Sequence, residues 1–239
     1  MQRFFDILFS SLALIVLSPI LIPIAIILRF TGEGEVFYKQ KRVGQGGKEF
    51  DLIKFATMLK DSPNLHTGTI TVKNDPRVLP VGRFLRKTKI NELPQLINIL
   101  KGDMSIIGPR PQDKRCFIAF PKKAQEEIIK VKPGLSGIGS IVFRDEEVTL
   151  DNCNLEYDDC YDYHIAPYKG ELEIWYNKNN SLYVYFMLIF LTIWVVIFPN
   201  SQLYTKVFKN LPKKPKELAY LQKFKDRRLK DRRVEKARE

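Results

Sequence analysis

The chain is poor in the residues that usually form metal centres and disulfide frameworks. Its 239 residues include only three cysteines and two histidines. Cys116, Cys153 and Cys160 are an odd number with no C-x-x-C spacing, so neither a zinc site nor a disulfide framework is expected. Reduced thiols in a cytoplasmic environment are the simplest interpretation.

Charge is also absent from a long stretch near the N-terminus. Residues 7–28 carry no charge and would form a helix about 33 Å long, enough to cross the apolar core of a bilayer. A cleaved signal peptide is not expected, because Asp6 precedes the stretch and no small-x-small cleavage site follows it.

Two prolines interrupt this apolar stretch, one in Ser18-Pro19 and the other at Pro23. A proline inside a helix removes a hydrogen bond, so we expect a sharp break between two half-helices that enter and leave the membrane on one side. The freed carbonyl needs a polar partner, for which Ser18 and the lipid headgroup zone are candidates. A kinked spanning helix is the alternative, although positive residues on both flanks do not favour crossing.

The net charge of +12 is concentrated at the other end of the chain. Residues 206–239 hold fourteen Lys or Arg against five acidic residues, which gives +9 and leaves +3 for the rest. We expect a frayed or disordered tail that is attracted to anionic lipid, and no nucleic-acid binding, because the tail lacks a stacking platform. Before it, the charge-free run 182–198 predicts an interfacial or membrane helix.

The central stretch of the chain runs from Leu85 to Pro111. Apolar residues at i, i+3, i+4 and i+7 give one face of a short helix; they are Leu93, Leu96, Ile97 and Leu100. Asn91 is expected as its N-cap and Gly102 as its left-handed C-cap, with Pro94 in the first turn.

Charged residues gather around the start of this helix, with Arg86 before it, Glu92 in it, and Arg110 between two prolines after it. Guanidinium groups near a helix start favour a phosphate site. Ordinary capping residues and a solvated basic loop are the alternative interpretation.

The remaining segments are less informative. Residues 49–58 predict a strand that contains one cation, Lys54, which either extends to solvent or has a functional role. Four further segments are expected, which are a polar loop at 63–72, a second amphipathic helix at 117–131, a glycine-rich turn at 132–139 and an acidic segment at 145–162. The glycine-rich turn is not a P-loop, because no GK[ST] follows it.

Several short blocks, in this order, resemble a known family. They are Arg3-Phe4-Phe5-Asp6, Ser18-Pro19, Gln40-Lys41-Arg42-Val43-Gly44, Lys48-Glu49-Phe50, Lys54-Phe55, Asn74-Asp75-Pro76-Arg77, Val81-Gly82-Arg83-Phe84-Leu85-Arg86-Lys87-Thr88, Glu92-Leu93-Pro94-Gln95-Leu96, Gly102-Asp103-Met104-Ser105, Gly108-Pro109-Arg110-Pro111 and Lys132-Pro133-Gly134. From Arg3 to about Phe198, the chain resembles the small monotopic phosphoglycosyl transferases, the bacterial sugar transferase family that starts the assembly of lipid-linked glycans.

The resemblance implies transfer of a sugar phosphate from a UDP-sugar to undecaprenyl phosphate, with release of UMP. It also implies a re-entrant N-terminal helix, Mg²⁺ as cofactor, and a catalytic core on the cytoplasmic face of the bacterial inner membrane. In the family an Asp-Glu pair starts the central helix, which places the catalytic positions at Asn91 and Glu92, with Glu92 also at the metal. Lys54, Arg86, Arg110 and Arg144 would bind substrate.

Two positions depart from the family pattern, which has the nucleophilic Asp where this chain has Asn91 and an Arg where it has Ala56. An amide has no anionic oxygen and cannot readily form an acyl phosphate. Three interpretations stay open: Glu92 acts as nucleophile or general base, the donor reacts directly with the lipid phosphate, or the chain is an inactive homologue.

The expected fold is α+β, helix-rich and monotopic, with a compact catalytic core and interfacial helices. The expected segments are a re-entrant helix at 1–31, the core at 32–181, an apolar helix at 182–199 and a basic tail at 200–239. The expected partners are a UDP-sugar, undecaprenyl phosphate and inner-membrane lipid, with a homo-oligomer possible. Two other functions are weighed beside the transferase: a non-catalytic membrane component, and a single-pass anchor with a nucleic-acid-binding tail.

Overall fold

The structure is a computed structural model that describes residues 1–60, 62, 75–144, 146–153 and 155–219. The predicted loop at 63–72 and residues 220–239 of the predicted basic tail lie outside these residues. Within the described part, helices dominate and two two-stranded sheets are present, which confirms the α+β class. The chain forms two compact units: unit 1 holds Met1–Arg42 and Glu49–Ile106, and unit 2 holds Val43–Lys48 and the chain from Ile107 onward.

Unit 1 contains the long N-terminal helix, a hairpin and the central helix with its flanks. In chain order its elements are α1 (Gln2–Phe30), β1 (Phe37–Val43), β2 (Glu49–Phe55), α2 (Pro80–Lys87), the 3-10 turn η3 (Ile90–Glu92), α3 (Gln95–Lys101) and β3 (Ser105–Ile107). The last residue of β1 and of β3 belongs to unit 2.

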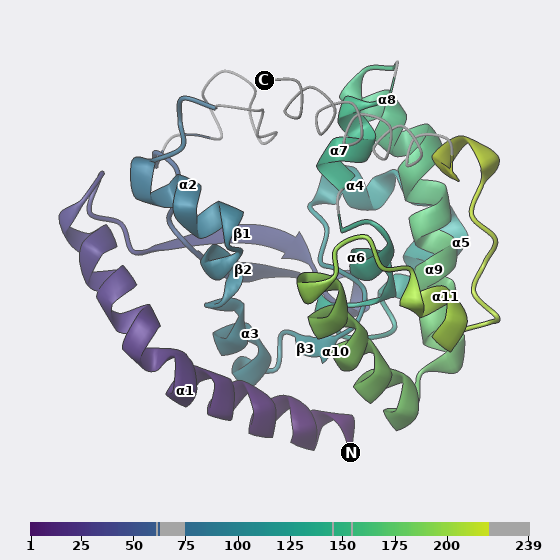
Figure 1. Ribbon diagram of the computed structural model, residues 1–239, viewed down its shortest axis with the longest axis horizontal. Helices are drawn as coiled ribbons and strands as arrows, with labels where there is room; N and C mark the ends of the chain where they lie inside the picture. The colour runs from purple at the N-terminus through teal and green to yellow at the C-terminus, as the bar shows by residue number, and fades with distance from the viewer. Residues whose placement is uncertain (61, 63–74, 145, 154, 220–239) are drawn as a thin grey trace, which may run out of the picture. The chain divides into compact units, whose positions relative to one another are not determined.

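Helix α1 is continuous through both of its prolines, so the two separate half-helices expected from the sequence are not present. Figure 1 shows that α1 changes direction along its length. The Ser18 hydroxyl donates to the carbonyl oxygen of Ile15 at 2.7 Å. This is the carbonyl to which the missing N–H of Pro19 would have donated, so the expected role of Ser18 is confirmed and the helix continues.

By length and composition α1 could cross or anchor in a membrane. Its most apolar window has a mean hydropathy of 2.7, and only 6% of that window is buried within the protein. Its second half packs on the rest of unit 1, where Leu28 of α1 forms a buried cluster with Phe55 and Leu85. The re-entrant path stays a prediction.

Strand β1 was not expected, because the sequence reads as a turn-rich connection there. Its side chains are mostly exposed, so it lacks the alternation of buried and exposed residues that marks a strand in the sequence. Pairing with β2 forms the hairpin, and the rings of Phe37 and Phe55 stack across it with centroids 5.6 Å apart. The predicted strand at 49–58 is confirmed as β2 over Glu49–Phe55.

Helix α3 starts later than the sequence suggests. Asn91 is not its N-cap, because a 3-10 turn occupies Ile90–Glu92 and regular helix begins at Gln95 after Pro94. The C-cap is confirmed, since Gly102 has φ +94° and its N–H donates to the carbonyls of Asn98 and Ile99.

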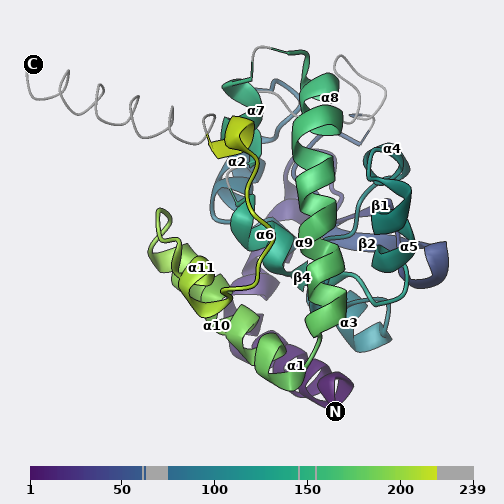
Figure 2. The ribbon, with the colours of Figure 1, turned by 90° about the vertical axis from the view of Figure 1, so that its right-hand side faces the viewer.

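Unit 2 is built around one helical column. Its elements are the 3-10 turn η1 (Gln45–Gly47), α4 (Lys114–Ile118), α5 (Lys122–Ile128), β4 (Gly134–Ser136), α6 (Ile138–Val142), α7 (Glu146–Asp151), α8 (Tyr157–Cys160), the π-helical η4 (Tyr161–Ile165), α9 (Ala166–Asn179), α10 (Leu182–Ile197) and α11 (Leu203–Val207). Figure 2 shows α8 and α9 in line as that column, with α5 and α6 on different sides of it.

Two segments of unit 2 differ from expectation. The single helix expected at 117–131 is broken into α4 and α5, because Pro121 has no N–H to continue α4 and instead caps α5. The segment expected as a glycine-rich turn at 132–139 instead holds strand β4 and the start of α6. Its backbone packs on that of Gly108: a Cβ on Gly134 would lie 2.1 Å from the Gly108 amide nitrogen, and one on Gly137 would lie 2.2 Å from the Gly108 carbonyl oxygen. These glycines therefore serve the fold.

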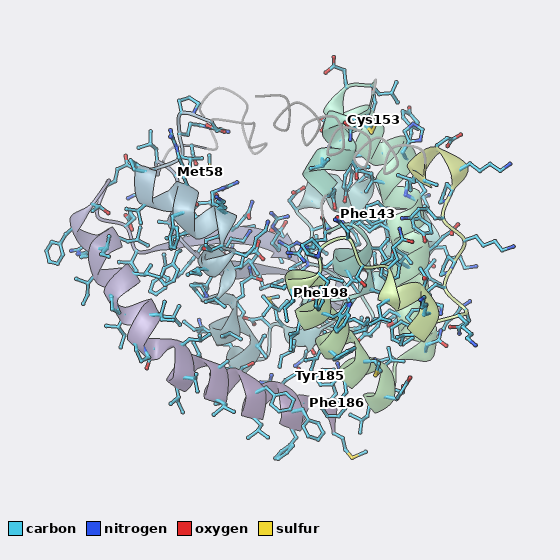
Figure 3. The ribbon with its side chains drawn as sticks, viewed as in Figure 1. Met58, Phe143, Cys153, Tyr185, Phe186 and Phe198 are labelled. Carbon is cyan, nitrogen blue, oxygen red and sulfur yellow. A yellow bond between two sulfur atoms is a disulfide. The ribbon has the colours of Figure 1, made fainter. Side chains whose placement is uncertain are left out.

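A disulfide joins Cys153 and Cys160, so the expectation of reduced thiols is wrong for this pair. The turn between α7 and α8 brings their Cα atoms to 6.4 Å, a local return of the chain that cysteine counting does not reveal. Figure 3 shows Cys153 at the α7–α8 end of the unit. Cys116 keeps a free thiol, whose pKa is raised to about 11 by burial.

The predicted helix in the second apolar run is confirmed as α10. One face of α10 packs inside unit 2 through Tyr185, Leu188 and Leu191, which are fully buried. Phe186, on the helix beside Tyr185 (Figure 3), remains exposed, as do Ile193 and Ile197. An interfacial or membrane position for this exposed apolar face stays a prediction.

Candidate functional site

Unit 1 brings together four of the residues that the sequence singled out. The turn η3, which carries Asn91 and Glu92, contacts both β2 and α2. Lys54 lies in β2 and Arg86 in the last turn of α2, and both side chains are half-buried. Residues from three separate segments therefore meet around one short turn.

Close backbone packing fixes the position of α2 in this group. A Cβ on Gly82 would lie 2.2 Å from the carbonyl oxygen of Thr57, so only glycine lets α2 approach the segment after β2. One turn later, Arg86 Nη1 lies 3.5 Å from Met58 Sδ on that same segment. Gly82 therefore helps to position the Arg86 guanidinium. From the sequence alone, this glycine cannot be distinguished from an ordinary helix residue.

The turn itself is shaped by a left-handed residue. Lys89 has φ +60°, an uncommon conformation for a side-chain-bearing residue. The amide of Glu92 then donates to the carbonyl oxygen of Lys89 at 3.1 Å. This reversal separates α2 from α3 and presents Asn91 and Glu92 together between them.

Asn91 has an unusual environment. Its side chain is 7% exposed, and no described residue hydrogen-bonds its buried Oδ1. One turn later Gln95, at 2% exposure, has a buried Nε2 that also has no partner among the described residues. Buried polar atoms are usually paired, so two unpartnered atoms one turn apart are candidates to bind a ligand.

The two predicted arginines of unit 2 occupy separate segments of that unit. Arg110 is half-buried and follows β3, while Arg144 is exposed and follows α6. The strand pair anchors both segments, because the Gly108 amide donates to the Ser136 carbonyl at 2.9 Å and the Gly134 amide to the Pro109 carbonyl at 2.8 Å. Within unit 2, then, one backbone ladder precedes both arginines.

Ala56, the second departure from the family pattern, lies immediately after β2. It is 6% exposed, and its amide donates to the carbonyl oxygen of Val36 at 2.9 Å. The core accommodates a small residue there. The chain therefore lacks the guanidinium group that the family pattern has at this position.

The oxygen atoms at the turn are suited to a magnesium ion. Mg²⁺ is usually bound through one or two protein oxygens together with substrate phosphates and water. Glu92 offers a carboxylate, and Asn91 offers the buried unpartnered Oδ1. Within the described residues no group of three His, Cys, Asp or Glu side chains could hold a metal, so Mg²⁺ bound at this turn would complete its coordination with substrate phosphates or water.

Sequence reasoning missed the side chains that fix the C-terminal part of α3 against the rest of unit 1. Arg3 donates to the carbonyls of Ile99 and Leu100 at the end of α3. The side chain of Asn98 accepts one hydrogen bond from the backbone of β2 and donates another to it. Asp6 accepts from the amide of Ile106 at 3.0 Å. The available signal was their isolation, since each is a polar residue within or beside an apolar run.

A buried ion pair supports the segment before α2. Asp75 and Arg77 are each 2% exposed, and Arg77 Nη2 lies 2.6 Å from Asp75 Oδ2. Arg77 Nη1 also donates to the carbonyl oxygen of Ser62 at 2.6 Å. Arg77 therefore braces the core and is not among the candidate phosphate-binding residues.

The model of the bacterial sugar transferase family matches residues 1–199. The chain belongs to the bacterial sugar transferase family. This match includes η3, α2, β2 and both arginine-bearing segments, so every candidate site residue of this bacterial sugar transferase lies within it.

The chain is also similar to several named proteins. The chain is 32% identical over 198 residues to the UDP-N-acetylgalactosamine-undecaprenyl-phosphate N-acetylgalactosaminephosphotransferase of Aeromonas hydrophila, which covers 82% of this chain and 43% of the relative. It is 40% identical over 167 residues to the UDP-glucose:undecaprenyl-phosphate glucose-1-phosphate transferase of Klebsiella pneumoniae, covering 67% and 35%. It is 35% identical over 161 residues to the exopolysaccharide production protein ExoY of Rhizobium meliloti, covering 61% and 70%. The chain therefore spans less than half the length of the first two relatives.

Proposed function

We propose that this chain transfers a sugar 1-phosphate from a UDP-sugar to undecaprenyl phosphate at the cytoplasmic face of the bacterial inner membrane. The observation that carries the proposal is the meeting of β2 and α2 at the turn with Asn91 and Glu92, where the Asn91 Oδ1 is buried and unpartnered. The names of the Aeromonas and Klebsiella relatives support the acceptor. Because these two relatives differ in their sugar, the sugar of this chain stays open.

Each site residue has a proposed role that follows from its chemistry. Lys54, Arg86, Arg110 and Arg144 would bind phosphate oxygens, because guanidinium and ammonium groups complement their charge. Asn91 Oδ1 and Glu92 would hold Mg²⁺, which when bound neutralises part of the diphosphate charge.

The transfer breaks the bond between the β-phosphorus of the donor and the oxygen that leaves with UMP. In the direct route, an oxygen of the lipid phosphate attacks that phosphorus, and the arginines stabilise the charge that passes to UMP. In the two-step route, the Glu92 carboxylate attacks first and the lipid phosphate then displaces it. Release of UMP before acceptor is added distinguishes the second route from the first.

The test is UMP release by the detergent-solubilised protein with Mg²⁺, undecaprenyl phosphate and a panel of UDP-sugars. Glu92→Gln and Arg110→Ala should each reduce turnover by about a hundredfold or more, because each removes a group that acts on the developing charge. Matched substitutions of exposed residues, Glu126→Gln and Arg83→Ala, should leave it unchanged. Wild-type turnover in both site variants would overturn the proposal.

The proposed membrane geometry has a separate test. A re-entrant α1 leaves its two flanks on the cytoplasmic side, so cysteines introduced at Gln2 and Glu33 should both react only with a reagent that reaches that side. Labelling from opposite sides would show a spanning helix and would contradict the monotopic arrangement.

A non-catalytic membrane component is the second candidate, and the amide at Asn91 favours it. It predicts no UMP release from any donor that binds, while membrane attachment survives Glu92→Gln. Fractionation of membranes beside the turnover assay separates the two candidates.

A further inference from the structure

A lysine of unit 2 is buried beside the segment that carries Arg144. Lys169 lies in α9 and is 3% exposed, which is rare for a charged side chain without a dedicated partner. Its Nζ lies 2.6 Å from Glu146 Oε2. The rings of Phe143 and Tyr161 have their centroids 5.9 and 5.7 Å from the same nitrogen. One carboxylate and two aromatic rings therefore surround the ammonium group.

The contacts of Lys169 fall on both sides of Arg144 along the chain. Phe143 directly precedes Arg144, and Glu146 follows two residues later. The amide of Glu146 also donates to the carbonyl oxygen of Phe143 at 3.1 Å. Phe143 is buried at 5% exposure, whereas Arg144 itself is exposed. The backbone that carries Arg144 is thus held from both sides while its guanidinium faces solvent.

A second titratable residue of α9 contacts the other end of α6. Glu173 lies one turn beyond Lys169 and is 3% exposed. A Cβ on Gly139 would lie 2.3 Å from Glu173 Oε1, so α6 packs directly on this carboxyl group. The amide of Phe143 in turn donates to the Gly139 carbonyl at 2.9 Å. Glu173 therefore contacts the first turn of α6, while Lys169 contacts Phe143 and the first residue of α7.

Stability alone does not account for a buried charge pair of this kind. Desolvation offsets much of the attraction, and well-packed apolar residues often serve the core equally well. What the pair supplies is a fixed geometry, because a charge-assisted hydrogen bond at 2.6 Å defines where Glu146 must lie.

We propose that Lys169 is a positioning residue: through Glu146 and Phe143 it fixes the backbone of Arg144 so that the guanidinium is ready to bind the diphosphate of a nucleotide donor. This rests on the proposed function only for the identity of the ligand. Lys169 itself touches neither donor nor acceptor.

The first test is a double-mutant cycle on UDP binding to the full-length protein with Mg²⁺ present. Glu146→Gln is the primary variant, because Glu146 is 27% exposed and glutamine keeps the side-chain shape while it removes the charge. It should weaken UDP binding about tenfold, as expected for losing a hydrogen bond to a charged group. In an Arg144→Ala background the same substitution should change UDP affinity less than about twofold, because coupled residues are not additive.

Matched variants complete the cycle. Lys169→Arg should restore most of the affinity lost in Lys169→Met, and Glu171→Gln, at an exposed position of α9, should have no effect. An equal loss on Glu146→Gln in both backgrounds, or no loss in either, would overturn the positioning role.

The second test is hydrogen exchange at the amides of Ile141 and Phe143, which does not depend on any ligand. Both amides should exchange faster in Glu146→Gln and Lys169→Met, while amides of α5 keep their wild-type rates. Unchanged exchange rates would overturn the proposal that Lys169 and Glu146 fix this backbone. Faster exchange in a protein that binds no UDP would instead support the structural role of Lys169 and Glu146. It would contradict a nucleotide donor and so count against the proposed function.

Discussion

The two ends of helix α3 differ in whether their buried polar groups have hydrogen-bond partners. At the C-terminal end, Asn98 bonds the backbone of β2 on both sides, and Asp6 bonds the backbone of β3. At the N-terminal end, Asn91 Oδ1 and Gln95 Nε2 are buried with no partner among the described residues. A completed set of hydrogen bonds stabilises the fold, whereas an incomplete set leaves groups that a ligand can complete. We therefore distinguish a structural end of α3 from its N-terminal end, which we propose binds the ligand and call the functional end.

The largest effect is expected at the structural end. Asn98→Leu leaves the buried amide of Ile53 and the part-buried carbonyl of Asp51 without their partner, and we expect it to lower the free energy of unfolding by about 3 kcal/mol. Chemical denaturation in detergent measures this. A loss below about 1 kcal/mol would show that the side chain is not the bond between α3 and β2.

A smaller loss is expected where α1 meets β3. Asp6 accepts from Ser105 Oγ and from the amide of Ile106, both at 3.0 Å, and it is 2% exposed. Asp6→Ala should cost about 2 kcal/mol, because a buried amide loses its acceptor. Ser105→Ala, which removes only the hydroxyl donor, is the matched comparison. Equal losses in the two variants would show that the Ile106 amide is not the important partner.

Glu173 extends the comparison to unit 2, since its Oε2 is also buried without a partner among the described residues. Burial raises the pKa of Glu173 from its ordinary 4.5 to about 7, while nearby Lys169 lowers it in part. The folded protein therefore keeps a proton that the unfolded chain loses, and stability falls as pH rises from about 4.5 to about 7. Glu173→Gln should flatten the Tm-against-pH curve over this range, and exposed Glu171→Gln should not. A curve of wild-type steepness in Glu173→Gln would contradict the assignment.

The smallest effect on stability is expected at the functional end. Asn91→Leu is the same substitution as Asn98→Leu, but it removes an oxygen that has no partner to lose. We expect the free energy of unfolding to change by less than about 1 kcal/mol. Binding of UDP in the presence of Mg²⁺ should nevertheless weaken in this variant. A loss of stability as large as that of Asn98→Leu would remove the difference between the two ends.

Local chemistry made part of the fold predictable. Gly102 and α10 follow from sequence pattern alone, and Ser18 could be assigned to a freed carbonyl because a proline has a fixed effect four residues back. Long-range pairing was not predictable in the same way. Strand β1 carries four exposed residues of seven, so the partner β2 defines it more than its own sequence does.

The site was only partly predictable. Lys54, Arg86 and Glu92 could be selected from resemblance, but the reason they meet lies in Gly82, where a close backbone approach is needed, and in Lys89, whose left-handed conformation no pattern announced. The start of α3 was placed too early, because Asn91 and Glu92 have the composition of a helix cap while lying in a 3-10 turn. Composition records which residues favour a turn, and only packing determines which turn forms.

The measurement that tests the account most directly is UMP release by wild type, Asn91→Asp and Asn98→Asp with one UDP-sugar that thermal shift shows to bind. If the turn is the reaction site, Asn91→Asp releases one equivalent of UMP before acceptor is added, since an aspartate there supplies the anionic oxygen that the amide lacks. Asn98→Asp, at the structural end of the same helix, gives no such burst. A donor that binds while Asn91→Asp releases no UMP, with or without undecaprenyl phosphate, would contradict the assignment of this turn as the catalytic site.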